Sequence, residues 1–193
     1  KTFAPNTIFV GQNSTLTIRL NNNDADTNLT GATYTDTLPA GLILASQPPN
    51  PTVTNCGAGS SLTAVAGTNV ITLGNGTVTP AQDCVVTVSV TGAYGQYTNT
   101  IPAGPGGPGS LQTNQGVTNN TPASANLNVQ PVAIAKAFSP TPIDAGDTST
   151  LTITLQNPTG APYTGAAISD NLTTMGTGIT IAGAPTANTC GFT

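Results

Sequence analysis

The chain contains its opening stretch twice, and this repeat constrains the fold more than any other feature. Residues 1–20 read KTFAPNTIFVGQNSTLTIRL, and residues 136–155 read KAFSPTPIDAGDTSTLTITL. With one residue dropped, the match continues as far as Cys56-Gly57 and Cys190-Gly191. A period of about 135 residues is the length of a whole small domain, which predicts a tandem array of globular modules and not a short-period solenoid.

This period sets the expected domain boundaries. Residues 1–130 should form one complete module, and residues 131–193 the N-terminal half of a second, truncated copy. Residues 130–135 lack the composition of a flexible linker, so the second copy should follow the first almost directly.

Charged residues are scarce, which excludes several functions. The 193 residues include three Lys or Arg, seven Asp and no Glu or His, for a net charge of −4. Without a basic patch, nucleic acid and anionic membrane surfaces are poor partners. No apolar run is long enough to span a bilayer. Without His or Glu, no catalytic triad or carboxylate pair is recognisable, so we expect neither an enzyme nor a cofactor.

The remaining composition predicts an all-β fold. The 22 Gly and 16 Pro residues separate short alternating runs rich in Thr, Val and Ile, and surface helix formers are nearly absent. Leu16 and Ile18 should face the core from one strand, and Cys84 from another. Residues 74–76 predict a hairpin turn, and residues 102–109 an exposed loop. Expected strands are residues 7–10, 14–20, 31–37, 43–45, 53–56, 61–66, 70–73, 84–90, 95–101, 111–118 and 123–129.

Three further motifs carry a family resemblance. They are DTLPAGL at residues 36–42, YTNTIPAG at 97–104 and NNTPASANLNV at 119–129. With the repeated opening stretch, they resemble the immunoglobulin-like repeats, long catalogued as domains of unknown function, of large bacterial surface and secreted proteins. The resemblance implies an immunoglobulin-like antiparallel β-sandwich, used in tandem in adhesins, stalks and matrix proteins, with no catalytic residues. The second copy departs from the pattern at residues 171–176, where the Pro turn is lost.

The three cysteines fit this repeat. Cys56 and Cys84 fall within one module, whereas Cys190 is the counterpart of Cys56 and has no partner within the chain. We predict a disulfide between Cys56 and Cys84, which would place the protein outside the reducing cytosol. Two buried free thiols are the alternative. Metal binding by two cysteines without any His is a weaker one.

Two small clusters could carry chemistry. Asp24 and Asp26 lie in a loop rich in oxygen ligands and could bind Ca²⁺. A solvated loop with Asx-turns is the simpler explanation, because the second copy has no Asp there. Lys1 matches Lys136, and surface domains of this kind can form Lys–Asn isopeptide bonds beside a buried carboxylate. Asp36 with Asn99 or Asn126 would then complete the group. The alternative is that Lys1 only solubilises a strand end.

Three functions remain open. The first is a rigid stalk or spacer module in a bacterial extracellular or surface protein, with neighbouring copies of the repeat as its partners. The second is a subunit of an extracellular filament, completed by strands from a neighbouring subunit. The third is an adhesin domain that binds glycan or protein, although the chain has no Trp to form an aromatic platform.

Overall fold

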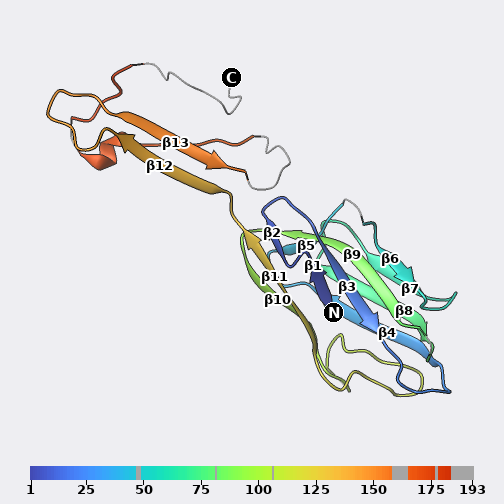
Figure 1. Ribbon diagram of the computed structural model, residues 1–193. Coiled ribbons are helices and arrows are strands. Elements are labelled where there is room, and N and C mark those ends of the chain that lie inside the picture. Colours follow the sequence, from blue (N-terminus) through green and yellow to red (C-terminus); the bar gives the residue numbers. More distant parts are fainter. Residues whose placement is uncertain (47–48, 81, 106, 158–164, 177, 184–193) are drawn as a thin grey trace. The chain divides into compact units, whose positions relative to one another are not determined.

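Strands built on apolar–polar alternation are the main secondary structure of the computed structural model (Figure 1). It describes residues 1–46, 49–80, 82–105, 107–157, 165–176 and 178–183. The chain divides into two compact units, Lys1–Val132 and Ala133–Thr193, so the division falls just after the boundary expected at residue 130.

The first layer of unit one is an antiparallel sheet centred on two long strands. Its strands are β1 (Thr2–Ala4), β3 (Ser14–Leu20), β9 (Cys84–Gly92), β5 (Leu42–Leu44) and β6 (Thr52–Thr54). The order is β1-β3-β9-β5, and β6 also pairs with β9. Leu16 lies opposite Val88 in the register and both are fully buried, so the inward alternation expected for these strands is confirmed.

The second layer contains two three-stranded sheets. One has the order β4-β8-β7, with β4 (Leu29–Thr37), β8 (Val70–Val78) and β7 (Ser61–Ala64). The other has the order β10-β11-β2, with β10 (Gly95–Ile101), β11 (Ala123–Gln130) and β2 (Thr7–Phe9). The opening segment therefore contributes to both layers, because β1 pairs antiparallel with β3 and β2 pairs parallel with β11. The cis Ala4–Pro5 peptide lies between these two strands.

The layers enclose one core. Its largest fully buried side chains come from both layers: Ile8, Leu16, Leu38, Leu42, Ile71, Leu73, Leu127, Val78, Val86, Val88, Val90 and Val129. The fold is an immunoglobulin-like β-sandwich, as predicted.

The hairpin predicted at residues 74–76 is wrong. β8 runs without interruption from Val70 to Val78, and its partner β4 shifts register between Leu29 and Tyr34. Asn75 adopts a left-handed φ of 51° inside the strand. The turn-forming residues here make an irregularity in the β4–β8 ladder because both sides of β8 are already paired, with β4 and β7.

The segment after β10 also differs from its prediction. Residues 111–118 form no strand and contribute only an isolated bridge between Thr33 and Gln112. The predicted exposed loop is largely half-buried, because Gly109 O accepts a hydrogen bond from Thr35 N at 3.2 Å. Asn114 N likewise donates to Thr30 O at 2.9 Å. This segment thus covers the free edge of β4, which would otherwise be open to pairing with another chain.

Unit two begins with a hairpin that repeats the start of unit one. β12 (Ala133–Ser139) pairs with β13 (Thr150–Gln156), and Phe138 lies opposite Leu151 as Phe3 lies opposite Leu16. Ser149 Oγ donates to Pro140 O at 2.7 Å, as Ser14 Oγ donates to Pro5 O at 2.6 Å. A 3₁₀-helix, η1 (Leu172–Met175), occupies the stretch where the second copy departs from the family pattern.

Within the part of the chain that the structure describes, there is no α-helix, as expected. None of its helices has the length and apolarity that crossing a membrane requires.

Candidate functional site, a buried Lys–Asp–Asn cluster

Lys1 and Asp36 form an ion pair inside unit one. Lys1 directly precedes β1, and Asp36 lies near the end of β4, where Ala32, Tyr34 and Asp36 alternate inward. Lys1 Nζ lies 2.8 Å from Asp36 Oδ2, and neither side chain has any exposed surface. The attraction between the opposite charges holds this buried pair together.

Asn99 completes the cluster from β10. Its side chain is fully buried, and its Nδ2 donates to Asp36 Oδ1 at 3.0 Å and to Thr37 O at 3.3 Å. One oxygen of the Asp36 carboxylate therefore contacts the Lys1 amine and the other contacts the Asn99 carboxamide. Asn99 Oδ1 is buried and accepts no hydrogen bond.

Burial shifts both ionisable groups of the cluster toward their neutral forms. It lowers the pKa of the Lys1 ammonium and, more weakly, the attraction of Asp36 opposes this change. It raises the pKa of the Asp36 carboxyl, again against the smaller opposing effect of Lys1. Desolvation of the two charges therefore makes proton transfer from Lys1 to Asp36 less unfavourable in this buried site than it would be in water.

Tyr34 is a neighbour that the sequence analysis did not include. Its hydroxyl is buried without a hydrogen-bond partner, and burial followed by the nearby Asp36 charge raises its pKa. A cavity of about 190 Å³ is lined by Lys1, Tyr34, Ile101 and several neighbouring side chains. The sequence did contain a signal for Tyr34, because it stands two residues before Asp36 and so shares its inward face.

Asn126, the other asparagine considered for this group, lies elsewhere. Its side chain is exposed on β11, where its Oδ1 accepts a hydrogen bond from Thr98 Oγ1 at 2.8 Å. The β10–β11 register places Asn126 opposite Thr98 and Asn99 opposite Ala125. Of the two asparagines, only Asn99 therefore reaches Asp36.

Unit two repeats the lysine–aspartate contact. Lys136 Nζ lies 2.8 Å from Asp170 Oδ2, and these two residues are the sequence counterparts of Lys1 and Asp36. Their side chains are 37% and 29% exposed, unlike the pair in unit one. Both units therefore contain the same lysine–aspartate contact, which is fully buried in unit one and partly exposed in unit two.

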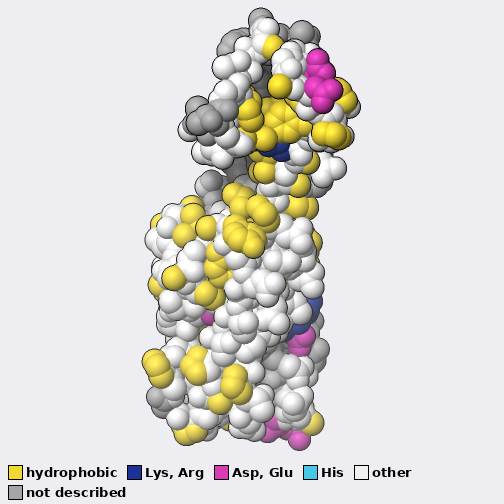
Figure 2. Space-filling view, turned by 90° about the vertical axis from the view of Figure 1, so that its left-hand side faces the viewer, with side chains coloured by type: hydrophobic (Ala, Val, Ile, Leu, Met, Phe, Trp, Pro, Cys, Tyr) yellow, Lys and Arg dark blue, Asp and Glu magenta, His cyan; other side chains and the backbone are white. Residues whose placement is uncertain are grey.

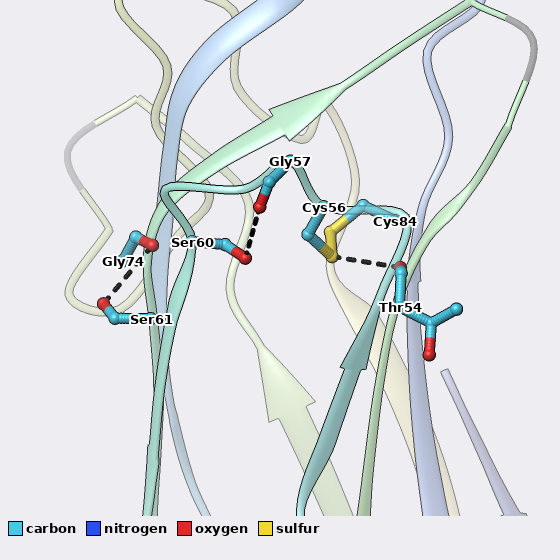
Figure 3. The surroundings of a disulfide bond; sticks show 7 residues. All are labelled: Thr54, Cys56, Gly57, Ser60, Ser61, Gly74 and Cys84. Carbon is cyan, nitrogen blue, oxygen red and sulfur yellow. Dashed lines mark hydrogen bonds between the residues drawn. A yellow bond between two sulfur atoms is a disulfide. The ribbon is translucent and has the colours of Figure 1, made fainter.

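Cys56 and Cys84 form a disulfide, with their Cα atoms 4.5 Å apart (Figure 3). The bond joins the segment after β6 to the first residue of β9, and both cysteines are buried. The Cys56 sulfur also lies 3.3 Å from Thr54 O, a packing contact because a disulfide sulfur has no proton to donate. Cys190 lies outside the described residues.

Asp24 and Asp26 form a local turn. Asp24 Oδ1 accepts hydrogen bonds from Asp26 N at 2.9 Å and Thr27 N at 3.0 Å, and these bonds lower the pKa of Asp24. Oδ1 of Asp24, one of the oxygens considered for calcium, thus already accepts backbone hydrogen bonds in an Asx-turn. Across the described ranges, no group of three or more Cys and Asp side chains is arranged to hold a metal ion.

A family model matches residues 1–129 of the chain and matches residues 131–193 separately. Its description is a domain of unknown function, DUF7933. The chain belongs to the DUF7933 family. The Lys–Asp–Asn cluster and the disulfide both lie within the first stretch matched to DUF7933.

Two solved structures are similar to this DUF7933 chain. One is a cohesin module from a family 33 glycoside hydrolase of Clostridium perfringens ATCC13124, with 16% identity, a TM-score of 0.46, and 65% of this chain and 91% of that module covered. The other is the collagen-binding domain of a Staphylococcus aureus adhesin, with 13% identity, a TM-score of 0.39, and 64% and 93% covered. No curated protein matches the chain.

Proposed function

We propose that this chain is a non-catalytic structural module of a bacterial extracellular or surface protein, in which copies of the module follow one another as a stalk or spacer. The observation that carries this proposal is the recurrence of one strand pairing in both units. The β1–β3 register of unit one reappears in β12–β13, together with the same serine-to-proline hydrogen bond. A second copy that starts directly after the first serves to extend a chain of modules.

Three further observations support the proposal. The Cys56–Cys84 disulfide favours an oxidising compartment outside the cytosol. The Lys1 and Asp36 side chains lie together in the core of unit one and have no exposed surface. Figure 2 shows a surface with few charged side chains, in keeping with a module that is not built to attract charged ligands.

Solution X-ray scattering can test the spacer function. The sample would be a chain in which residues 1–135 are followed directly by residues 1–132, so that the natural joint connects two complete modules. We expect a monomer whose maximum dimension is close to twice that of residues 1–132 alone. A compact particle, in which the two modules fold back on each other, would contradict the proposal.

A filament subunit is the second candidate, and the exposed apolar residues of unit two favour it. Ile134 on β12 is 61% exposed, and Ile143, Ile168 and Ile181 are also exposed. Hydrophobic side chains gather on the surface of this unit in Figure 2. Sedimentation velocity of the 193-residue chain over a range of concentrations separates the two candidates, because polymers that grow with concentration would support the filament and a constant monomer would support the spacer.

A further inference from the structure

We propose that Lys1 and Asn99 join in an isopeptide bond, with Asp36 carrying the protons of the reaction. The bond would link the residue before β1 to the middle of β10 and would form without any other protein. It goes beyond the proposed function and does not depend on it, since a spacer, a filament subunit and an adhesin domain could all contain it.

The geometry of the cluster supplies the first argument. A nucleophilic amine and a carboxamide contact the two oxygens of one carboxylate, at 2.8 Å and 3.0 Å. Asp36 can therefore exchange a proton with Lys1 Nζ through Oδ2 and with Asn99 Nδ2 through Oδ1. Residues from three separate segments are held together by the fold, which replaces a bimolecular encounter with an intramolecular one.

The chemistry balances with these three side chains alone. Proton transfer within the ion pair gives a neutral Lys1 amine and a neutral Asp36 carboxyl. The Nζ lone pair attacks Cγ of Asn99, an Nζ–Cγ bond forms, and the Cγ–Nδ2 bond breaks. Asp36 gives its proton to the departing Nδ2 and takes one from Nζ. One ammonia leaves, and Asp36 is again the neutral carboxyl that it was just before the attack.

The surroundings favour the neutral reactants. The side chains of Lys1, Asp36 and Asn99 are all fully buried, and the shifted pKa values of Lys1 and Asp36 both favour the uncharged forms that the attack requires. The cavity beside Lys1 and Tyr34 is lined in part by the exposed residues Arg19 and Asn21, which gives ammonia a route to the surface.

The distribution of lysine in the sequence is a second, independent observation. The chain contains three basic residues, Lys1, Arg19 and Lys136. Both lysines occupy the same position of the repeat, and each lies 2.8 Å from the matching aspartate. A lysine needed only for solubility could stand anywhere on the surface, whereas a fully buried lysine is costly unless it is paired.

Trypsin digestion of the unfolded, reduced 193-residue protein tests the bond directly. Cleavage after Arg19 and Lys136 divides the chain into residues 1–19, 20–136 and 137–193. Because Lys1 and Asn99 lie in different fragments and both disulfide cysteines lie in the second, only an isopeptide bond can hold the first two together after reduction. We expect a single species with the summed mass of these two fragments less one ammonia.

Matched variants identify the atoms. Lys1→Met should release both fragments at their full masses. Lys136→Met, at the equivalent position of unit two, should leave residues 1–19 joined to residues 20–193 after cleavage at Arg19. Asn99→Ala and Asp36→Ala should abolish the bond, and Asn126→Ala should preserve it. The digest of the unaltered protein still decides the question if a core variant fails to fold.

Two results would overturn the proposal. Free fragments from the unaltered protein would show that Lys1 and Asp36 remain an ordinary ion pair. Joined fragments that have lost one water would mean that Lys1 had bonded to Asp36 and not to Asn99.

Discussion

At the scale of single residues, strand parity decides which side chains meet. Asn99 shares the inward face of β10 with Ile101, whereas Asn126 has the opposite parity to the buried Leu127 and Val129 on β11. The sequence named Lys1, Asp36 and both asparagines, and the alternation of β11 already contained the information that excludes Asn126. The contact among the other three could not be predicted, because it depends on how β1, β4 and β10 pack across the sandwich.

Gly41 in the DTLPAGL motif offers a test at this scale. Its φ is +99°, and an added Cβ would lie 2.6 Å from the Tyr97 hydroxyl, which donates to Ala93 O at 2.8 Å. Gly41→Ala should cost about 1–2 kcal/mol of unfolding free energy from the left-handed backbone alone. Displacing the tyrosine hydrogen bond should add about 1 kcal/mol. Urea denaturation measures the sum.

Gly67→Ala is the matched control for that variant. Gly67 has a similar left-handed φ of +80°, but an added Cβ there meets nothing within 4 Å. It should therefore show only the backbone cost. Equal losses for the two variants would mean that the Tyr97 contact does not stabilise the turn.

At the scale of elements, the local sequence pattern predicts the central strands of a sheet correctly. It fails for segments whose structure depends on the strands that pair with them. β3 and β9 have regular alternation and form at the predicted places, because each buries most of one face. The turn signal at residues 74–76 was overridden by pairing on both sides of β8. The apolar residues after Ser110 follow the edge of β4 as an irregular cover, and no local pattern distinguishes such a cover from a strand.

The disulfide gives the test at the scale of elements. It closes a loop between residues 28 positions apart and holds the end of the β6 segment on the start of β9. Replacing both cysteines by alanine should lower the unfolding free energy by about 3–4 kcal/mol on the chain-entropy estimate. Chemical denaturation at equilibrium would measure this.

Reduction of the unaltered protein should reproduce the loss, and Cys190→Ser should leave the unfolding transition of unit one in place. An unchanged transition after complete reduction would show that the bridge contributes nothing to stability.

At the scale of the whole molecule, the described part of the chain places the core of unit one within that unit. Among the described residues, the buried cluster runs from Phe3 to Val129 and includes none from unit two. Residues 1–132 alone should therefore fold, with amide NMR signals that overlay those of the same residues in the full chain. Residues 1–98 should remain unfolded because β2 then lacks β11, and a folded spectrum from that shorter chain would contradict the role given to β10 and β11.

The parallel pairing of β2 with β11 has a mechanical consequence. These strands stand near the start and the end of unit one, with Thr7 opposite Asn128 and Phe9 opposite Gln130. When the two ends of the module are pulled apart, parallel strands are drawn in opposite directions along their length. All the hydrogen bonds between them then carry the tension together and resist it as shear, whereas an antiparallel pair in the same place would open one bond at a time.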